Sequence, residues 1–559
     1  MTTFSHLLQR QVTENPERIS VTLQQSGADD LPLTYRSLYE GAISYFNTYQ
    51  REGIQPGDVV VLIFQHGRDL IHSYWGAVFL GAIPSVLPFL TEKLSPERYQ
   101  ADLASLISIT RPAAIVTYRE FEANVRGALR EGDSVRALIC SDAIETTSAA
   151  AWDALPGLRR SPDDVALLQH SSGSTGLQKG VALSHRAVIN QLETYGRSLG
   201  LNREDVIVSW LPLYHDMGLI AGFLMPILFG VPLVLQSPFD WIGAPYILPQ
   251  AVSRHKGTLT WLPNFAYNFC AQKIRDRHLA DVDLSSWRAV INCSEPVKKD
   301  SHQAFYERFK NFGLRPTAMQ TCYAMAENVF AVTQSDLAAE PVHEAVDRES
   351  FFFERVARLA YDGRPAITLM SSGKPLESVK VRILNERGHD VAERTVGEIA
   401  LQSDCMLTGY YNRPEVTEKA FLDGWYLTGD FGYLANGELF VTGRKKDMII
   451  VGGKNIYPQD LEALVSETPG VHAGRVVAFG VFDESAGTEE VVIVAEVEAE
   501  DPAQRQEIGE AVRLMVSKNT AVVPRQVYLV GPKWIVKTSS GKVARSANRE
   551  KYLKEIQAK

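Results

Sequence analysis

Ser171-Ser-Gly-Ser-Thr-Gly-Leu-Gln-Lys-Gly180 is a run of small residues that contains a single lysine. The apolar run 164–169 before it predicts a buried strand, and the run 184–190 after it predicts a helix that begins at its cap, Ser184. A glycine-rich loop at a strand end exposes backbone N–H groups, which bind phosphate oxygens. The stretch therefore predicts a polyphosphate-binding loop in an α/β fold.

This loop is not a Walker A motif, which needs four residues between a glycine and a Gly-Lys-Ser/Thr triplet. Lys179 is followed by Gly180, and neither Gly173 nor Gly176 has Gly-Lys at the required offset. A flexible Gly/Ser turn is the simpler alternative, so other motifs along the chain have to decide between a phosphate loop and a turn.

Composition limits the class of protein. A chain of 559 residues is too long for one compact core and predicts two or more domains. Its 45% hydrophobic and 22% charged residues are typical of a soluble globular protein. The net charge of -9 and the pI near 5.8 argue against nucleic acid as the main partner. The five cysteines are odd in number and lack metal-binding spacing, which favours the reducing cytoplasm.

No segment predicts export or stable membrane insertion. Residues 1–11 lack the apolar core of a signal peptide and predict an amphipathic helix that buries Phe4, Leu7 and Leu8. The uncharged stretch 219–235 contains two glycines and two prolines, which break it into a buried helix, a turn and a strand.

Short apolar runs alternate with helical periodicity over the first half of the chain, which predicts stacked βα units with mostly parallel, buried strands. These runs are Val59–Phe64, Ala113–Thr117, Ala137–Cys140, Val206–Ser209 and Ala289–Asn292. From residue 380 the strands follow one another more closely and predict a small antiparallel barrel or sheet. They are Lys380–Leu384, Gly397–Gln402 and Gly437–Thr442.

The end of the chain predicts a small α+β domain with its own core. Strands are expected at 476–482 and 491–497, separated by a polar turn at 483–490. A helix face is expected at Ile508, Val512, Met515 and Val516.

Two carboxylates follow predicted strands or turns and suit nucleotide chemistry. Glu327 lies where a loop leaves a sheet and can bind a hard cation, and Tyr323 in the same run can stack on a base. Asp430 follows a tight turn and can accept both hydrogen bonds from a ribose diol. The alternatives are a solvated surface acid for Glu327 and a capping residue for Asp430.

Three cations near the end of the chain complete the candidate set. Lys542 ends a small flexible loop that begins at Lys537, and its long side chain can reach a distant site. An ordinary exposed lysine is the alternative. Arg444 and Lys446 lie between the predicted sheet and the last domain.

Taken together, the motifs resemble the adenylate-forming superfamily of acyl-, aryl- and aminoacyl-activating enzymes over nearly the whole chain. In order they are SSGSTGLQKG (171–180), LPLYHDMG (211–218), NCSEPV (292–297), CYAMAE (322–327), GWYLTGD (424–430), GRKKD (443–447) and KTSSGK (537–542). The runs 211–218, 262–267, 292–296 and 450–462 resemble the fatty acyl-AMP ligase branch. An extra segment near 347–368 lies where that branch carries an insertion.

The resemblance implies a large N-terminal adenylation domain at 1–442, built from stacked βα sheets and a small β-barrel. It also implies a hinge at 443–446, with Lys446 as the hinge residue, and a small, mobile α+β domain at 447–559.

The resemblance further implies two half-reactions. A carboxylate attacks the α-phosphate of ATP to give acyl-AMP and pyrophosphate, and a thiol, usually the phosphopantetheine of an acyl carrier protein, then takes the acyl group. Positioning and charge neutralisation dominate the first step.

The resemblance assigns roles to residues by motif. The β- and γ-phosphates would bind Ser171, Ser172, Gly173, Ser174, Thr175, Gly176 and Lys179. The adenine would lie against Ser294, Glu295, Pro296, Tyr323, Ala324 and Met325. Asp430 and Arg444 would bind the ribose, Glu327 would bind Mg²⁺, and Lys542 would bridge the substrate carboxylate and the α-phosphate.

The acyl pocket is expected beside apolar motif residues, which favours a hydrophobic tail on the acid. They are Tyr214, His215, Met217, Phe265, Ala266 and Tyr267. A gate or packing role is expected for His215 rather than catalysis, because the chemistry has no obvious need of a histidine base. Asp216 is expected to make a structural hydrogen bond rather than to clamp an amino acid.

The sequence departs from the family pattern at four positions. Ala324 replaces a usual glycine, and Cys293 and Ser294 replace a Gly-Ala pair beside the nucleotide. Val536 replaces a common proline, which predicts a less restrained Lys542 loop.

Three functions remain open from the sequence: a fatty acyl-AMP ligase that loads a carrier protein, an acyl-CoA ligase, and a catalytically silent scaffold. The insertion and the branch-like motifs favour the first over the second. The joint presence of Glu327, Asp430, Arg444 and Lys542 argues against the third.

Overall fold

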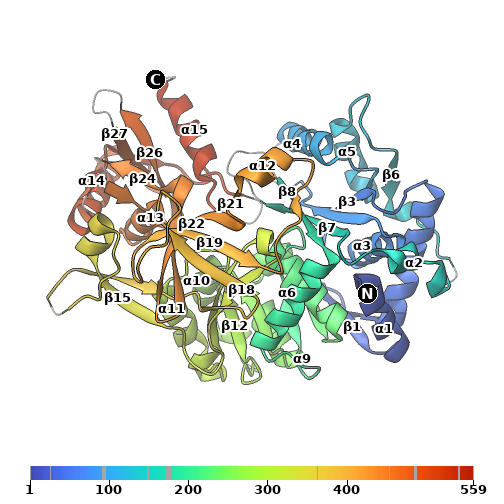
Figure 1. Cartoon of the computed structure of the whole chain (residues 1–559). Coiled ribbons are helices and arrows are strands. Elements are labelled where there is room, and N and C mark those ends of the chain that lie inside the picture. Colours follow the sequence, from blue (N-terminus) through green and yellow to red (C-terminus); the bar gives the residue numbers. More distant parts are fainter. Residues whose placement is uncertain are drawn as a thin grey trace. The chain divides into compact units, whose positions relative to one another are not determined.

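The computed structural model describes most of the chain (Figure 1). The described ranges are 2–25, 27–90, 96–147, 150–171, 179–361, 363–451, 454–483, 488–520, 522–538 and 542–557. Within these ranges, no helix combines the length and the apolar composition needed to cross a membrane.

Two compact units divide the chain. Unit 1 comprises 1–342, 371–380 and 401–426, and unit 2 comprises 343–370, 381–400 and 427–559. Both units mix helices and strands, which confirms the predicted α/β class. The expected boundary at 443–446 stays a prediction.

The first sheet of unit 1 has nine strands, and its middle strands pair in parallel, as the βα rhythm predicts. Its order is β17 (Lys374–Pro375), β14 (Ala331–Gln334), β13 (Met319–Ala324), β12 (Ala289–Asn292), β11 (Leu259–Leu262), β9 (Ile207–Ser209), β10 (Leu233–Gln236), β1 (Ile19–Gln24) and β2 (Leu31–Thr34).

The second sheet of unit 1 has seven strands and ends in an antiparallel pair, β7–β8, with β20 added at its edge. Its order is β20 (Gly409–Tyr410), β8 (Lys179–Ser184), β7 (Val165–Ser171), β4 (Ile83–Leu87), β3 (Val59–Ile63), β5 (Ala114–Thr117) and β6 (Ala137–Cys140). The sequence pattern does not predict β8, which lies between the glycine-rich run and the expected helix.

The helices of unit 1 precede its first strand or lie between its strands along the chain. Ser184 caps α6 by accepting a hydrogen bond from the Ala187 N–H, as expected. The helices are α1 (Phe4–Glu14), α2 (Tyr35–Arg51), α3 (Arg68–Leu80), α4 (Pro96–Thr110), α5 (Glu122–Ala128), α6 (His185–Ser198), α7 (Met225–Phe229), α8 (Pro238–Gly243), α9 (Ile247–His255), α10 (Asn264–Lys273), α11 (Lys299–Phe309) and α12 (Pro414–Lys419).

A five-stranded sheet occupies the region where a small barrel or sheet was expected. Its order is β18 (Val379–Leu384), β19 (Gly397–Ser403), β22 (Trp425–Ala435) and β21 (Phe421–Leu422), and β23 (Glu438–Arg444) pairs with β22. The expected insertion, 347–368, joins the paired strands β15 (His343–Asp347) and β16 (Ala366–Met370).

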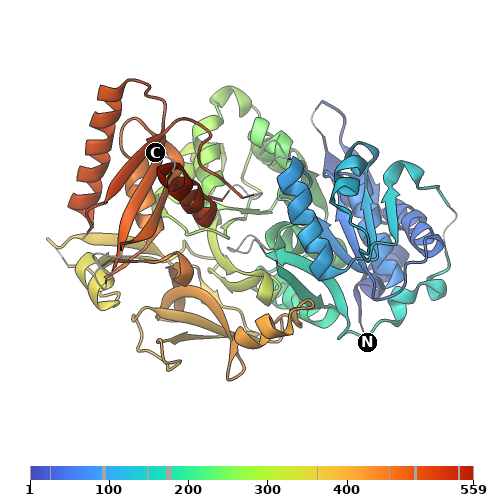
Figure 2. The ribbon, with the colours of Figure 1, turned by 90° about the horizontal axis from the view of Figure 1, so that it is seen from above.

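The last part of unit 2 has two cores, one on each face of a three-stranded sheet. Its strands are β26 (Val471–Asp483), β27 (Thr488–Val497) and β28 (Gln526–Val530), its helices are α13 (Pro458–Ser466), α14 (Pro502–Asn519) and α15 (Arg545–Gln557), and β24 (Ile449–Val451) pairs with β25 (Lys454–Ile456). Val476 and Ala478 pack in a cluster with residues of α14, whereas Val477 and Phe479 pack in another with Tyr552 of α15, which follows the strand period of two. Figure 2 shows these two helices, in red and dark red, on different sides of the orange strands. The expected turn at 483–490 is too long, because Asp483 still pairs with Thr488.

Arg545 joins α15 to the elements around it. Its guanidinium donates to Asp447 at 2.6 Å, to both oxygens of Glu462 at 2.8 and 3.0 Å, and to the Ala478 carbonyl at 2.9 Å. The Arg545 side chain is 16% exposed. The Asp447 and Glu462 carboxylates are also largely buried, so water could not replace the guanidinium as their partner.

Arg545→Met should destabilise this part of the chain by about 3 kcal/mol, because it leaves two poorly solvated carboxylates without their cation. Hydrogen exchange of the β26 and β27 amides should then accelerate about 100-fold. Arg549→Met, on an exposed position of the same helix, is the matched control. Equal exchange in the two variants would contradict the anchoring role.

Candidate active site

The motifs 292–297 and 322–327 lie at the carboxyl ends of two neighbouring parallel strands. β12 and β13 pair with Asn292 opposite Thr321, so both motifs lie at the carboxyl ends of their strands. This edge is where α/β sheets bind ligands. The structure therefore brings together, in unit 1, the residues expected to hold the adenine.

Ser294 has a backbone φ of 71°. This left-handed conformation is uncommon for a residue with a side chain, and such residues gather at functional sites. Its hydroxyl lies 3.9 Å from the Met217 sulfur, which places an expected adenine residue beside an expected acyl-pocket residue. Glu295 accepts a hydrogen bond from the Phe265 N–H at 3.0 Å.

Tyr323 and its neighbours end β13. Tyr323 is 8% exposed and Ala324 is the last residue of the strand, at a bulge. Ala324 therefore stays extended, and the replacement of glycine introduces no left-handed backbone here. The Tyr323 hydroxyl lies 4.0 Å from the Met325 sulfur.

Glu327 lies in a short 3₁₀ turn that follows β13 and is half-buried. The Tyr410 hydroxyl donates to its Oε1 at 2.9 Å, and the Leu407 N–H donates to its carbonyl at 2.8 Å. The solvated surface acid considered from the sequence does not describe this environment. Glu327 is held from two sides by the segment around β20.

A strained turn follows Glu327. Val329 has φ 63° and ψ -57°, and the Phe330 N–H donates to the Asn328 carbonyl at 2.7 Å. This is a γ-turn of the rare, strained kind, here with a β-branched residue at its centre.

Tyr410 extends the contacts of Glu327 in two directions. Its hydroxyl lies 3.0 Å from that of Tyr426, and the Lys179 ammonium lies 4.8 Å from the centroid of its ring. Burial raises the pKa of Tyr410 and of Tyr426, so both phenols stay protonated at neutral pH. Tyr410 lies outside the sequence motifs, and Tyr426 lies within the motif 424–430, which assigns it no role. Their contacts join segments far apart in the chain, so spacing along the sequence does not predict them.

The glycine-rich run is described only at its ends. Ser171 pairs with Lys179 in the β7–β8 ladder. Ser172, Gly173, Ser174, Thr175 and Gly176 lie outside the described residues.

The motif 211–218 leads into a π-helix, Met217–Leu224. π-Helical turns are frequent at functional sites. The Asp216 carboxylate accepts from the Met217 N–H at 2.8 Å and caps this helix, which confirms the expected structural role of Asp216. Gly218 is required by packing, because a Cβ there would lie 2.2 Å from the Pro212 carbonyl oxygen.

The expected acyl-pocket residues occupy different surroundings. Tyr214 packs edge-on against His215, and Phe265 is half-buried. Tyr267 is fully buried, stacks on His302 with centroids 5.0 Å apart and donates to the Val290 carbonyl. Tyr267, on α10, thus packs against α11.

Two indoles next to Phe265 are not predicted by the motifs. Trp210 and Trp241 stack with ring centroids 3.7 Å apart at an interplanar angle of 2°. Both rings also lie edge-on to Phe265, at 6.4 and 6.3 Å. Among the described residues, neither indole N–H has a hydrogen-bond partner.

Asp430 and Arg444 are partners across the β22–β23 ladder in unit 2. Their side chains approach to 3.6 Å, and the Asp430 carboxylate is 15% exposed against 50% for the Arg444 side chain. Asp430 lies within β22, so it caps no helix. The pair presents an acceptor and a donor side by side, which suits a diol.

Lys446 lies exposed in the 3₁₀ turn Lys445–Asp447 that follows β23. The preceding segment is tightly packed, because a Cβ on Gly443 would lie 2.4 Å from the Gln459 amide nitrogen. Gln459 also donates to the Thr442 carbonyl at 2.6 Å. The hinge role of Lys446 stays a prediction.

The described residues on either side of 539–541 are held at the base of the loop that carries Lys542, and the expectation of a less restrained loop stays a prediction. The Val536 N–H donates to the Asn548 side chain at 2.8 Å, and the Asn548 amide donates back to the Val536 carbonyl at 2.9 Å. The Thr538 N–H donates to the Lys542 carbonyl at 2.7 Å, and Lys537 forms a bridge with Val543. Proline has no N–H, so the first of these bonds depends on the replacement.

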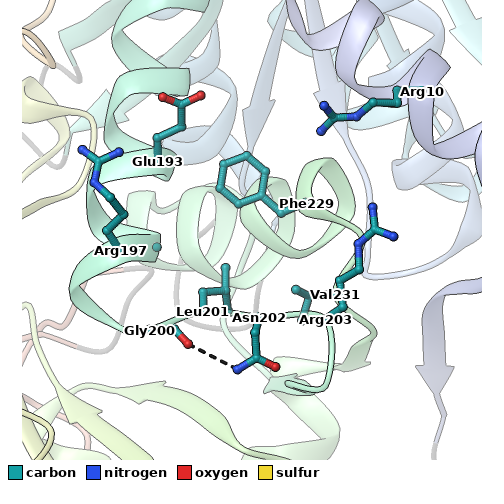
Figure 3. Close-up of a pocket in the computed structure, with 10 residues that line it drawn as sticks. Arg10, Glu193, Arg197, Gly200, Leu201, Asn202, Arg203, Phe229 and Val231 are labelled. Carbon is teal, nitrogen blue, oxygen red and sulfur yellow. Dashed lines mark hydrogen bonds between the residues drawn. The ribbon is translucent and has the colours of Figure 1, made fainter.

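A separate cavity of about 430 Å³ lies in unit 1 (Figure 3). Its rim carries three arginines together with Glu193, over the ring of Phe229. Two of the arginines, Arg197 and Arg203, lie 3.5 and 4.0 Å from glutamates. No residue of the predicted active site lines this cavity.

Comparison with known proteins agrees with the motifs. Residues 8–411 match the family described as AMP-binding enzyme. A long-chain-fatty-acid–AMP ligase of Mycobacterium marinum is 31% identical over 576 residues, covering 98% of this chain and 96% of the relative. A medium-chain-fatty-acid–[acyl-carrier-protein] ligase of Moorena producens is 29% identical over 572 residues, covering 99% and 95%.

Solved structures give the same result. A chain from a study of fatty acyl-adenylate ligases of E. coli and L. pneumophila superimposes with a TM-score of 0.89 at 28% identity, covering 100% of this chain and 99% of that one. The chain therefore belongs to the AMP-binding enzyme family and, within it, to the branch of fatty acyl-AMP ligases.

Asn548→Ala should loosen the base of the Lys542 loop, because it leaves the Val536 N–H without its partner, at a cost of about 1–3 kcal/mol, and removes one of the two donors to the Val536 carbonyl. We expect limited proteolysis to cleave the 536–544 segment faster in this variant. Val536→Pro in the Asn548→Ala background should recover part of the protection, since proline restrains the backbone without an N–H. Unchanged cleavage of Asn548→Ala would show that these bonds do not hold the loop.

Proposed function

We propose that this chain activates a fatty or related apolar carboxylic acid with ATP and passes the acyl group to the phosphopantetheine thiol of an acyl carrier protein. The observation that carries the proposal is the whole-length similarity to an acid–AMP ligase and to an acid–carrier protein ligase. The site residues present in the two units support it.

In the first half-reaction a carboxylate oxygen attacks the α-phosphorus of ATP. The bond to the β-phosphate breaks, and acyl-AMP and pyrophosphate form. Two anions must approach each other, so cations and oriented dipoles at the phosphates supply most of the acceleration. Lys179 in β8 and the N–H groups of the adjoining run would hold the β- and γ-phosphates, and Lys542 would bridge the carboxylate and the α-phosphate.

Other residues would fix the nucleotide. Ser294, Glu295 and Pro296 with Tyr323 would line the adenine slot, and Asp430 with Arg444 would bind the ribose hydroxyls. The 3.6 Å approach of Asp430 and Arg444 supports this role, because one side chain accepts and the other donates.

Glu327 fits a magnesium ion by its chemistry. Mg²⁺ usually takes one or two carboxylates together with substrate phosphates and water. Within the described ranges, no group of three or more His, Cys, Asp and Glu side chains is arranged to hold a metal. Glu327 would therefore share the ion with the nucleotide, where Mg²⁺ neutralises phosphate charge.

In the second half-reaction the thiol sulfur attacks the acyl carbon and AMP leaves. We propose that 1–442 and 447–559 act as separate domains and that rotation at Lys446 withdraws Lys542 and opens the thiol route. The five buried, unpaired cysteines support a reducing, cytoplasmic location.

The test of the proposed function is acid-dependent pyrophosphate release from ATP, measured across straight-chain acids from short to long. Carrier loading is then followed by mass spectrometry with holo carrier protein or CoA as acceptor. We expect release with apolar acids and transfer to the carrier. Formation of the CoA ester instead would make the chain an acyl-CoA ligase, and no acid-dependent release would make it a silent scaffold.

Lys542→Ala should lower pyrophosphate release at least about 100-fold, because the cation between the two reacting anions is lost. Thiol transfer from pre-made acyl-AMP should stay within about 2-fold of the wild type, since the proposed rotation withdraws Lys542 from the site before that step. Lys554→Ala, exposed on α15, is the control. Equal loss in both half-reactions would refute this division of labour.

A further inference from the structure

Tyr410 touches two of the groups that the proposed function needs, although it belongs to neither motif. Its hydroxyl donates to Glu327 Oε1 at 2.9 Å, and its ring lies 4.8 Å below the Lys179 ammonium. The edge of one side chain thus contacts the candidate metal ligand, while its face contacts the candidate phosphate ligand.

The backbone fixes Tyr410 in this position. β20 pairs with β8 so that Tyr410 lies opposite Val181, two residues after Lys179. The Tyr410 N–H donates to the Thr417 hydroxyl at 2.9 Å, and the Leu407 N–H binds the Glu327 carbonyl. Tyr410 therefore lies on β20, the strand next to β8, and β8 begins at Lys179.

The hydrogen bonds run in one direction. A carboxylate only accepts, so Tyr410 donates its proton to Glu327, and the Tyr426 hydroxyl, 3.0 Å away, then donates to Tyr410. A directional bond at one carboxylate oxygen limits rotation of the carboxyl group. Tyr426, Tyr410 and Glu327 form a chain that orients the carboxylate.

The Lys179 ammonium over the ring face complements this arrangement. The face of an aromatic ring attracts a cation, whereas its hydroxyl edge binds an anion. Tyr410 thus holds a cation and a carboxylate at set positions on different sides of one rigid group. A metal–polyphosphate complex presents the opposite pattern, with a cation beside its anionic oxygens.

We propose that Tyr410 is a positioning residue that orients Glu327 toward a divalent cation and places Lys179 toward the phosphates of the same nucleotide. The inference rests on the proposed function and adds to it a group that does not touch the reacting atoms. Tyr426 supports Tyr410 in the same role.

Tyr410→Phe separates the two contacts, because it removes the hydrogen bond to Glu327 and keeps the ring under Lys179. Binding of Mn²⁺ is measured by electron paramagnetic resonance with α,β-methylene ATP, whose bridge between the α- and β-phosphorus cannot be cleaved, so no acyl-AMP forms. We expect about 10-fold weaker Mn²⁺ binding. Binding of the metal-free analogue, measured by calorimetry, should stay within about 2-fold, because the Lys179 contact remains.

Tyr410→Leu removes both contacts and should weaken the metal-free analogue as well. Tyr426→Phe should give a smaller loss of Mn²⁺ affinity than Tyr410→Phe and serves as the second test if Tyr410→Phe does not fold. Tyr411→Phe is the matched control, since that side chain packs against a hydrophobic cluster.

The role through Glu327 is tested by combination. In the Glu327→Gln background, Tyr410→Phe should add little further loss of Mn²⁺ affinity, because residues that act as one unit are not additive. Wild-type Mn²⁺ affinity in Tyr410→Phe, or full additivity with Glu327→Gln, would overturn the proposal. These binding measurements need no turnover. If acid-dependent pyrophosphate release is absent, the proposed function is refuted, and the Mn²⁺ measurements still test the role of Tyr410.

Discussion

The pairing of β20 with β8 is the contact on which the candidate site of unit 1 depends. These strands are far apart in the sequence, yet their short ladder sets Tyr410 beside the strand that begins at Lys179. The same segment binds the Glu327 carbonyl through the Leu407 N–H. A cation and a carboxylate expected to act on one polyphosphate are thus held by a shared strand edge, and their spacing follows from backbone geometry.

In unit 2, the candidate residues are positioned by strand register and by a side-chain amide. Asp430 and Arg444 are neighbours because β22 and β23 are in register there, so the ladder sets the distance between a donor and an acceptor. At the end of the chain, Asn548 binds both the N–H and the carbonyl of Val536 and acts as an extra rung. A buried side-chain amide can thus form hydrogen bonds with a backbone N–H and carbonyl that no neighbouring strand pairs with.

Local pattern predicted the elements better than their partners. The βα rhythm located β3, β5, β6, β9 and β12 within a residue or two, because apolar runs between turns reflect local burial. The sequence pattern did not predict β8, because this strand directly follows a glycine-rich run and precedes a capped helix. The roles of Tyr410 and Asn548 were not predicted, because their hydrogen-bond partners lie in other segments of the chain. Motif spacing along the sequence does not show which distant segments come together in the fold. The bonds of Val536 were not foreseen for the same reason, because their partner, Asn548, belongs to a helix further along the chain.

The strained residues of unit 1 bear on why this site keeps its shape. Ser294 and Val329 follow β12 and β13, whose carboxyl ends are neighbours, and both have positive φ. Conformations of this kind cost about 1–3 kcal/mol each, so surrounding contacts must over-determine them. Around Val329 these contacts are visible: the Phe330 N–H also approaches the Gln191 side chain, and Asn328 binds the Ala331 carbonyl. Glu327 lies in the 3₁₀ turn that directly precedes Val329, so the contacts that hold this strained backbone also restrain the segment that presents Glu327 to Tyr410.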